Sequence, residues 1–152
     1  MPNDELTITK RNLPHWFINN SVYFITFRTK KITLSEEERC SVLRHIVEGN
    51  NKYYTLFVAV VMPDHCHLIV KPDKNYSLSR ILKGIKGVTA RNINKIRCKK
   101  GSLWLDESFD RIIRNEEELK EKMEYILFNP VKKGLIEDPL LYKGLYINYD
   151  VF

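Results

Sequence analysis

The sequence lacks long apolar runs, and this absence limits where the protein can reside. None of its hydrophobic stretches approaches the roughly 20 residues that a membrane helix needs. Its first sixteen residues, MPNDELTITKRNLPHW, are polar where a signal peptide would be apolar. We therefore expect a cytoplasmic protein that makes no use of a membrane. The 152 residues, 43% of them hydrophobic, suffice for one globular domain spanning residues 1–152.

Cysteine is also scarce. The three cysteines, Cys40, Cys66 and Cys98, show no CxxC spacing and do not form an even set. Disulfide frameworks and zinc cages need paired or clustered cysteines, so we predict reduced thiols.

Acidic residues are nearly absent from one segment. Residues 71–100 contain ten Lys or Arg and a single acid, Asp73, whereas the rest of the chain contains 15 basic and 18 acidic side chains. A basic helix that is merely solvated remains an alternative. So strong a concentration of positive charge favours a surface that faces nucleic acid.

The hydrophobic pattern predicts the element order β-α-β-β-α-β-α. Strands are predicted at 21–29, 53–62, 65–70 and 109–113, and helices at about 36–49, 78–100 and 116–129. Ser35, Ser77 and Asn115 are the predicted N-caps of the helices. Pro130 should end the last helix, because the residue before a proline avoids the α region. This order fits an α+β fold, a ferredoxin-like antiparallel sheet with helices mainly on one face.

The third predicted strand carries two histidines, His65 and His67. Side chains at i and i+2 of a strand share a face, so these imidazoles point together and Cys66 points to the other side. Two neutral imidazoles can converge on one metal ion. Two hydrogen-bonded structural histidines are the alternative, and a metal would need further ligands.

The last predicted helix offers such a ligand. Its apolar face includes Leu119 and Ile126, and Tyr125 lies off that face. Asn129 is one turn after Tyr125 on the same side, and Lys122 flanks both. The plain alternative is a surface tyrosine beside an Asn-Pro helix end.

Three segments resemble the single-tyrosine HUH transposases, which include insertion-sequence transposases and REP-associated tyrosine transposases. They are MPDHCHLIV (62–70), LWLDESFDRIIRNEEEL (103–119) and YILFNPVKKGL (125–135). HUH denotes His, a hydrophobic residue and His, here His65-Cys66-His67. Residues 11–29 and 78–94 are also similar, so the resemblance covers about Arg11 to Leu135. The family fold is ferredoxin-like, with the His-x-His on a central strand.

The resemblance implies roles for individual residues. His65, His67 and Asn129 match the family's ligands of a divalent metal, Mg²⁺ or Mn²⁺. Tyr125 matches the nucleophile that attacks single-stranded DNA, often beside an imperfect hairpin, and forms a 5′-phosphotyrosine before strand transfer. This transesterification conserves bond energy, which is consistent with the absence of a Walker loop. The resemblance leaves open whether a homodimer or a monomer acts.

Candidate DNA-binding residues lie in two places. Those on the basic helix would contact phosphates without reading bases, and those beside the last strand could equally be surface ion-pair partners. They are Arg80, Lys83, Lys86, Arg91 and Lys95 on the helix, and Arg111 and Arg114 beside the strand. Base stacking by Tyr76 is one option, Trp104 is more typical of a core residue, and His15 of a structural one. Asp64 could align the metal site or simply form the turn before His65.

Other functions remain in competition at this level. The chain could be a non-catalytic nucleic-acid-binding module, such as a domesticated transposase, although Tyr125, His65 and His67 are all present. It could be another HUH nickase, although those usually occur in larger chains. A zinc hydrolase would need an acidic base, and the motif offers only Asp64. Two features depart from the family: many relatives have Asn in place of Asp64, and residues 136–152 lack the Trp-Ser-Ser type of ending.

Overall fold

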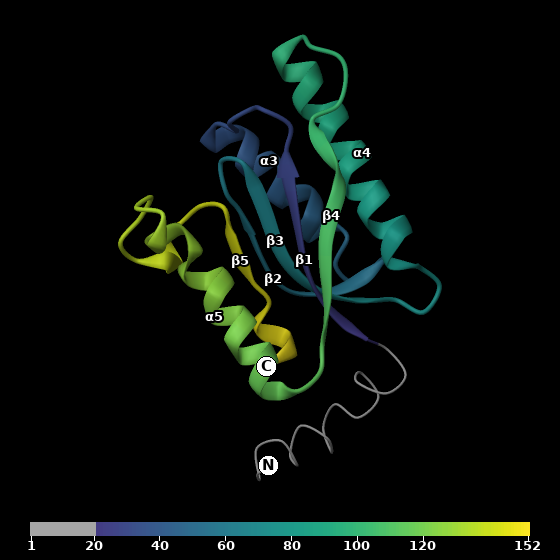
Figure 1. The fold of residues 1–152 in the computed structure, drawn as a ribbon, viewed down its shortest axis with the longest axis vertical. Coiled ribbons are helices and arrows are strands. Elements are labelled where there is room, and N and C mark those ends of the chain that lie inside the picture. Colours follow the sequence, from purple (N-terminus) through teal and green to yellow (C-terminus); the bar gives the residue numbers. More distant parts are fainter. Residues whose placement is uncertain (1–20) are drawn as a thin grey trace.

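The computed structural model describes residues 21–152, which form a sheet covered by helices on both faces (Figure 1). The elements are β1 (Val22–Thr29), α3 (Glu36–Glu48), β2 (Tyr54–Val61), β3 (His65–Pro72), α4 (Leu78–Arg97), β4 (Trp104–Ile113), α5 (Glu116–Lys132) and β5 (Leu145–Ile147). Short 3₁₀ turns at Pro139–Leu141 and Tyr149–Val151 flank β5. Within the described range, we find no helix with the length and apolar character needed to span a bilayer.

The five strands form one antiparallel sheet in the order β4-β1-β3-β2-β5. The first four strands and the two helices between them have the βαββαβ topology of the ferredoxin-like fold, which confirms the prediction. The strand β3 is central, between β1 and β2. The sequence did not predict β5, which adds a short edge strand to β2.

The helices divide between the two faces of the sheet. α3 and α4 pack on one face, and α5 packs on the other (Figure 1). Because alternate side chains of a strand point to opposite faces, Ile25 and Phe27 join the core under α3 and α4, and Phe24 joins the core under α5. Cys66 lies in the core under α3 and α4, so it points away from α5 as predicted.

The predicted helix starts are correct. The hydroxyl of Ser35 accepts a bond from the N–H of Glu38, whose carboxylate accepts one from the N–H of Ser35, a complete capping box. Ser77 and Asn115 cap α4 and α5 in the same way through their side-chain oxygens. The end of α4 was predicted too late. Cys98, with φ 55°, ends the helix three residues before Gly101.

The prediction that Pro130 ends α5 was wrong, because the helix runs through to Lys132. Proline removes only one backbone donor, and here its ring is buried while the helix continues for two more residues. The turn that follows closes with the N–H of Lys133 on the carbonyl of Asn129 and with Gly134 at φ 76°. Asn129 therefore stays helical and remains one turn after Tyr125.

Candidate active site

The two histidines lie side by side on β3, facing α5. Both are buried because β3 is central in the sheet, and their ring centroids are 4.7 Å apart. Nδ1 of His65 is 2.7 Å from Oδ1 of Asp64, and Nδ1 of His67 is 2.7 Å from Oγ1 of Thr26. Each ring is thus oriented through Nδ1, which leaves the two Nε2 atoms for the site. Metal-binding histidines are commonly oriented by a second hydrogen bond of this kind.

Neither Nε2 atom has a satisfactory partner among the residues that the structure describes. Nε2 of His67 is buried and has no hydrogen-bond partner among residues 21–152. Nε2 of His65 lies 3.2 Å from Oδ1 of Asn129. If the Nδ1–H of His65 donates its hydrogen bond to Asp64, then Nε2 of His65 is an acceptor. It faces Oδ1 of Asn129, which is also an acceptor. A bound cation would satisfy all three atoms, so the residues fit a metal ion.

Burial fixes the charge state of one imidazole. Desolvation, together with the neighbouring charges of His65 and Arg28, lowers the pKa of His67 to about 3. His67 is therefore neutral at physiological pH, which is the form that binds metals. The hydrogen bond from His65 holds the pKa of Asp64 below its usual value, so this carboxylate is charged.

Tyr125 projects from α5 next to the histidine pair. Its ring centroid lies 5.2 Å from that of His67 and 6.1 Å from that of Phe24, both edge-on, and the side chain is 47% exposed. Asn129, one helical turn later, is buried. Lys122, one turn earlier, places Nζ 5.2 Å from the Phe24 ring centroid. The structure therefore brings together the tyrosine, the asparagine and the two histidines that the sequence singled out.

A cavity of about 280 Å³ adjoins these residues and adds two cations that the sequence analysis missed. Tyr125, His65 and Asn129 line it together with Arg28 and Lys133. Arg28 was missed because only the strand pairing reveals its position: β1 sets Arg28 opposite His65, in the same register that sets Thr26 opposite His67. The position of Lys133, four residues after Asn129, was a signal that could have been used.

The predicted DNA-binding helix lies on the opposite face from the histidines. Among its predicted contacts, Lys83, Arg91 and Lys95 are exposed. Arg80 is also exposed, with its guanidinium 5.0 Å from the Tyr76 ring centroid.

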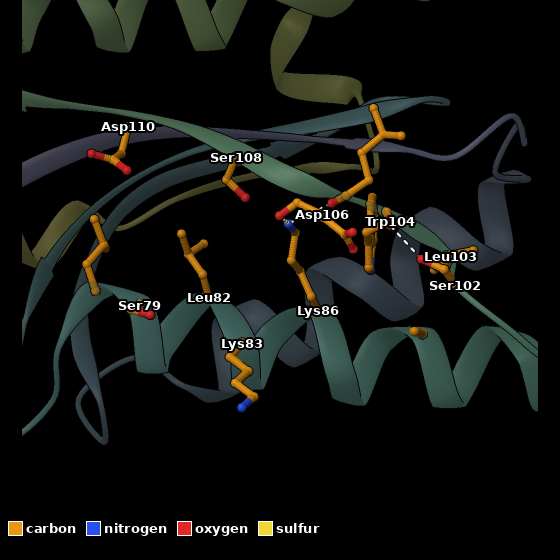
Figure 2. Close-up of a pocket in the computed structure, with 13 residues that line it drawn as sticks. Ser79, Leu82, Lys83, Lys86, Ser102, Leu103, Trp104, Asp106, Ser108 and Asp110 are labelled. Atoms are coloured by element: carbon orange, nitrogen blue, oxygen red, sulfur yellow. Dashed lines mark hydrogen bonds between the residues drawn. The ribbon is translucent and has the colours of Figure 1, made fainter.

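Lys86 differs from these side chains because it is held against β4. Its Nζ donates hydrogen bonds to the carbonyls of Leu105 and Asp106, across a cleft of about 540 Å³ between α4 and β4. Figure 2 shows Lys86 pointing to β4 while Lys83 points away. Lys86 is thus already engaged within the fold.

The remaining candidates have mixed outcomes. Nε of Arg111 lies 2.6 Å from a carboxylate oxygen of Glu118, so this arginine is an ion-pair partner. Arg114 is exposed. Trp104 is a core residue, as expected, with its indole N–H bonded to Thr89. His15 lies outside the described residues.

No group of three or more His, Cys, Asp or Glu side chains is placed to hold a metal within residues 21–152. The groups at this site that could hold a metal are two imidazoles and an amide. That set carries no negative charge, which distinguishes it from a carboxylate-rich site.

Comparisons with known proteins agree with this architecture. The family described as "Transposase IS200 like" matches residues 19–127. A Haemophilus influenzae protein described as a REP-associated tyrosine transposase is 23% identical over 139 residues, covering 80% of this chain and 76% of its own.

Two solved structures share the fold. A REP-associated tyrosine transposase bound to a REP hairpin superposes with a TM-score of 0.64 at 23% identity, over 78% of this chain and 72% of its own. A transposase from Deinococcus radiodurans superposes with a TM-score of 0.50 at 22% identity, over 70% of this chain and 88% of its own. With the family match spanning most of its length, this chain belongs to the IS200-like transposases, the single-tyrosine HUH family.

Proposed function

We propose that this protein cuts and rejoins single-stranded DNA, with Tyr125 as the nucleophile and one divalent ion held by His65, His67 and Asn129. The observation that carries the proposal is the position of Tyr125. Its ring lies beside two buried imidazoles, one of which has an Nε2 atom without a partner in the described chain. A buried acceptor left unpaired costs stability, so it points to a bound group.

The chemistry is a transesterification. The phenol oxygen of Tyr125 forms a bond to phosphorus, the bond from phosphorus to the 3′ oxygen breaks, and that oxygen leaves as a 3′-hydroxyl. The product is a 5′-phosphotyrosine. A second 3′-hydroxyl attacks its phosphorus, which rejoins the DNA and releases the tyrosine hydroxyl. A phenol with its usual pKa near 10 is a poor nucleophile at neutral pH, so it needs help.

The surrounding side chains supply part of that help. Arg28 and Lys133 line the cavity that Tyr125 enters, and their charges suit the oxygens of a phosphate. The aromatic contacts of Tyr125 with His67 and Phe24 hold its ring in one orientation. The metal, when bound, neutralises phosphate charge and orients the ester.

The ligand set favours Mn²⁺ over Mg²⁺, because imidazole is a better ligand for the former. Its lack of negative charge predicts modest affinity until a phosphate joins the site. Calorimetry with Mn²⁺ should therefore give weak binding that the double variant His65→Ala, His67→Ala loses. Unchanged binding in that variant would place the metal elsewhere. Asn129→Ala should reduce cleavage less than loss of either histidine.

The DNA partner is single-stranded where it is cut, and the cut lies near an imperfect hairpin in the same DNA. The exposed cations of α4 support phosphate contacts, and a relative of the same fold was solved with a REP hairpin. The proposed nucleophile and metal ligands meet within one chain, which supports cutting by a monomer over cutting by a homodimer with shared sites. Mixing the Tyr125→Phe and His67→Ala proteins tests this, because restored adduct formation would mean that two chains share a site.

Adduct formation is the decisive test of the proposal. Labelled single-stranded DNA incubated with the protein and Mn²⁺ or Mg²⁺ should give a covalent product on a denaturing gel. A pool with a randomised segment removes the need to know the recognised sequence. If no member of the pool forms an adduct, the protein is a non-catalytic nucleic-acid-binding module.

A further inference from the structure

An exposed phenyl ring lies on the same sheet face as the histidines. Phe109, on the edge strand β4, is 56% exposed. The strand register places it opposite Thr26 on β1, and Thr26 is opposite His67 on β3. The three residues thus form one row across the sheet. With two strand spacings of about 4.8 Å, the Cα atoms of Phe109 and His67 lie about 10 Å apart.

Phe24 connects this ring to the site. Its ring stacks on His67 at a centroid distance of 5.5 Å and meets Phe109 edge-on at 6.4 Å. The same ring meets Tyr125 at 6.1 Å and has Nζ of Lys122 5.2 Å from its centroid. The histidine, the nucleophile, a cation and the exposed phenyl ring all contact one buried aromatic side chain.

Among residues 21–152, no helix or strand covers Phe109. α5 packs on β2 and β3, towards the opposite edge of this face from β4 (Figure 1). A phenyl ring contributes little to stability where most of it faces water. Phe109 contacts the same Phe24 ring as Tyr125, and the exposed part of its own ring is available to a substrate.

We propose that Phe109 is the stacking platform for the base of a nucleotide flanking the scissile phosphate, with Lys122 beside the strand's phosphates. The proposal rests on the function proposed above and adds a residue that positions the strand. Single-strand binding sites combine aromatic faces for bases with cations for the backbone, and both occur here next to the nucleophile. A phenyl ring has no donor or acceptor, so the contact tolerates any base.

Binding to an oligothymidylate tests the platform without any cleavage. By fluorescence polarisation, Phe109→Ala should bind about 10-fold more weakly than the wild type, and Phe109→Trp should bind as well as the wild type. The indole of Phe109→Trp should also be quenched by the DNA beyond any quenching in the wild type. Ile112→Ala is the matched control, because Ile112 is 44% exposed on the same strand and faces the other way.

An oligomer of abasic sugar-phosphates separates stacking from charge. Phe109→Ala and the wild type should bind it equally, because no base remains to stack. Equal binding of oligothymidylate by the two proteins would overturn the proposal. Weaker binding of the abasic oligomer by Phe109→Ala would also overturn it. So would sedimentation showing that the substitution merely converts a dimer into a monomer.

The two proposals fail in different ways. If the wild type forms no adduct but Phe109→Ala still binds oligothymidylate more weakly than the wild type, the platform stands and the cutting chemistry is rejected. If the wild type and Phe109→Ala form adducts at the same rate and bind DNA with the same affinity, the cutting chemistry stands and the platform is rejected.

Discussion

The two faces of the sheet differ in whether their buried polar groups have hydrogen-bond partners. Under α3 and α4, the hydroxyl of Thr89 donates to the carbonyl of Ile85 and accepts from the indole of Trp104, so every one of these groups has a partner. Under α5, His67 keeps a buried Nε2 atom without a partner within the described residues. Folding alone explains the first arrangement, since buried polar groups are normally paired. The second arrangement has a cost that a bound group would offset.

Charge divides between the faces in the opposite sense. The basic helix α4 covers the face whose polar groups are satisfied, whereas the histidines lie on the other face. The cations of α4 are thus expected to contribute to binding but not to cutting, so replacing them should leave cutting by saturating protein intact.

The largest effect should come from Tyr125→Phe, which removes one oxygen from the α5 face. Adduct formation should vanish, because phenylalanine has no nucleophile. DNA affinity and the free energy of unfolding should stay unchanged, since the ring and its contacts with Phe24 and His67 remain. A denaturing gel measures the first, and Tyr149→Phe, at a tyrosine 70% exposed, is the control. An adduct formed by Tyr125→Phe would assign the nucleophile to another tyrosine.

Thr26→Val should have the next largest effect, because it removes the hydroxyl that orients His67 through Nδ1. Loss of such an orienting partner typically lowers metal affinity by about 10- to 100-fold. Thr26→Ser should restore Mn²⁺ binding in calorimetry. Thr89→Val is the counterpart on the other face and should cost about 1–3 kcal/mol of stability with no change in Mn²⁺ affinity. A matching loss of Mn²⁺ binding in Thr89→Val would remove the distinction between the faces.

A smaller effect should follow from the double variant Lys83→Ala, Arg91→Ala on α4. Two lost phosphate contacts should reduce the slope of log affinity against log salt by about 1.4, at about 0.7 per contact for single strands. Adduct formation at saturating protein should survive. Lys52→Ala, Lys143→Ala, two exposed cations outside α4, is the matched control. Equal slopes in all three proteins would make α4 a solvated surface and nothing more.

The smallest effect on the reaction should come from Glu38→Gln, although it should weaken the fold. The bidentate hydrogen bonds from Arg97 hold the pKa of Glu38 at about 2, below its ordinary 4.5. The carboxylate thus contributes stability that is fully present above pH 4.5 and is lost as the pH falls towards 2. Urea titrations should show the variant about 1–3 kcal/mol less stable at neutral pH. The difference should shrink through that window, and a constant difference would contradict the ion-pair explanation.

Local sequence signals predicted most of the fold because caps and periodicity act over a few residues. Ser35 and Asn115 marked helix starts correctly, and the spacing of His65 and His67 gave their common face. The strand register needs the whole sheet, so the position of Arg28 beside the histidines could not be predicted. β5 was missed because three residues are too few to show an alternating pattern.

Charge counting could not distinguish Lys86 from its neighbours for a related reason. Lys86 was one cation among ten in its segment, and nothing local distinguished it from Lys83. Its amine is committed to two carbonyls of β4, a strand nearly twenty residues further along the chain. Composition thus predicts the sign of a surface, whereas tertiary contacts decide which charges are available to a ligand.

Pro130 has a mechanical consequence for the site. Because proline carries no N–H, the carbonyl of Ile126 lacks its usual helical donor four residues on. The missing bond, from residue 130 to Ile126, is one residue further along than the pair Tyr125 and Asn129, which we propose as nucleophile and metal ligand. This part of α5 is therefore held by one backbone hydrogen bond fewer than the turns before it. We expect the separation of the Tyr125 and Asn129 side chains to adjust to a DNA strand without unwinding the helix.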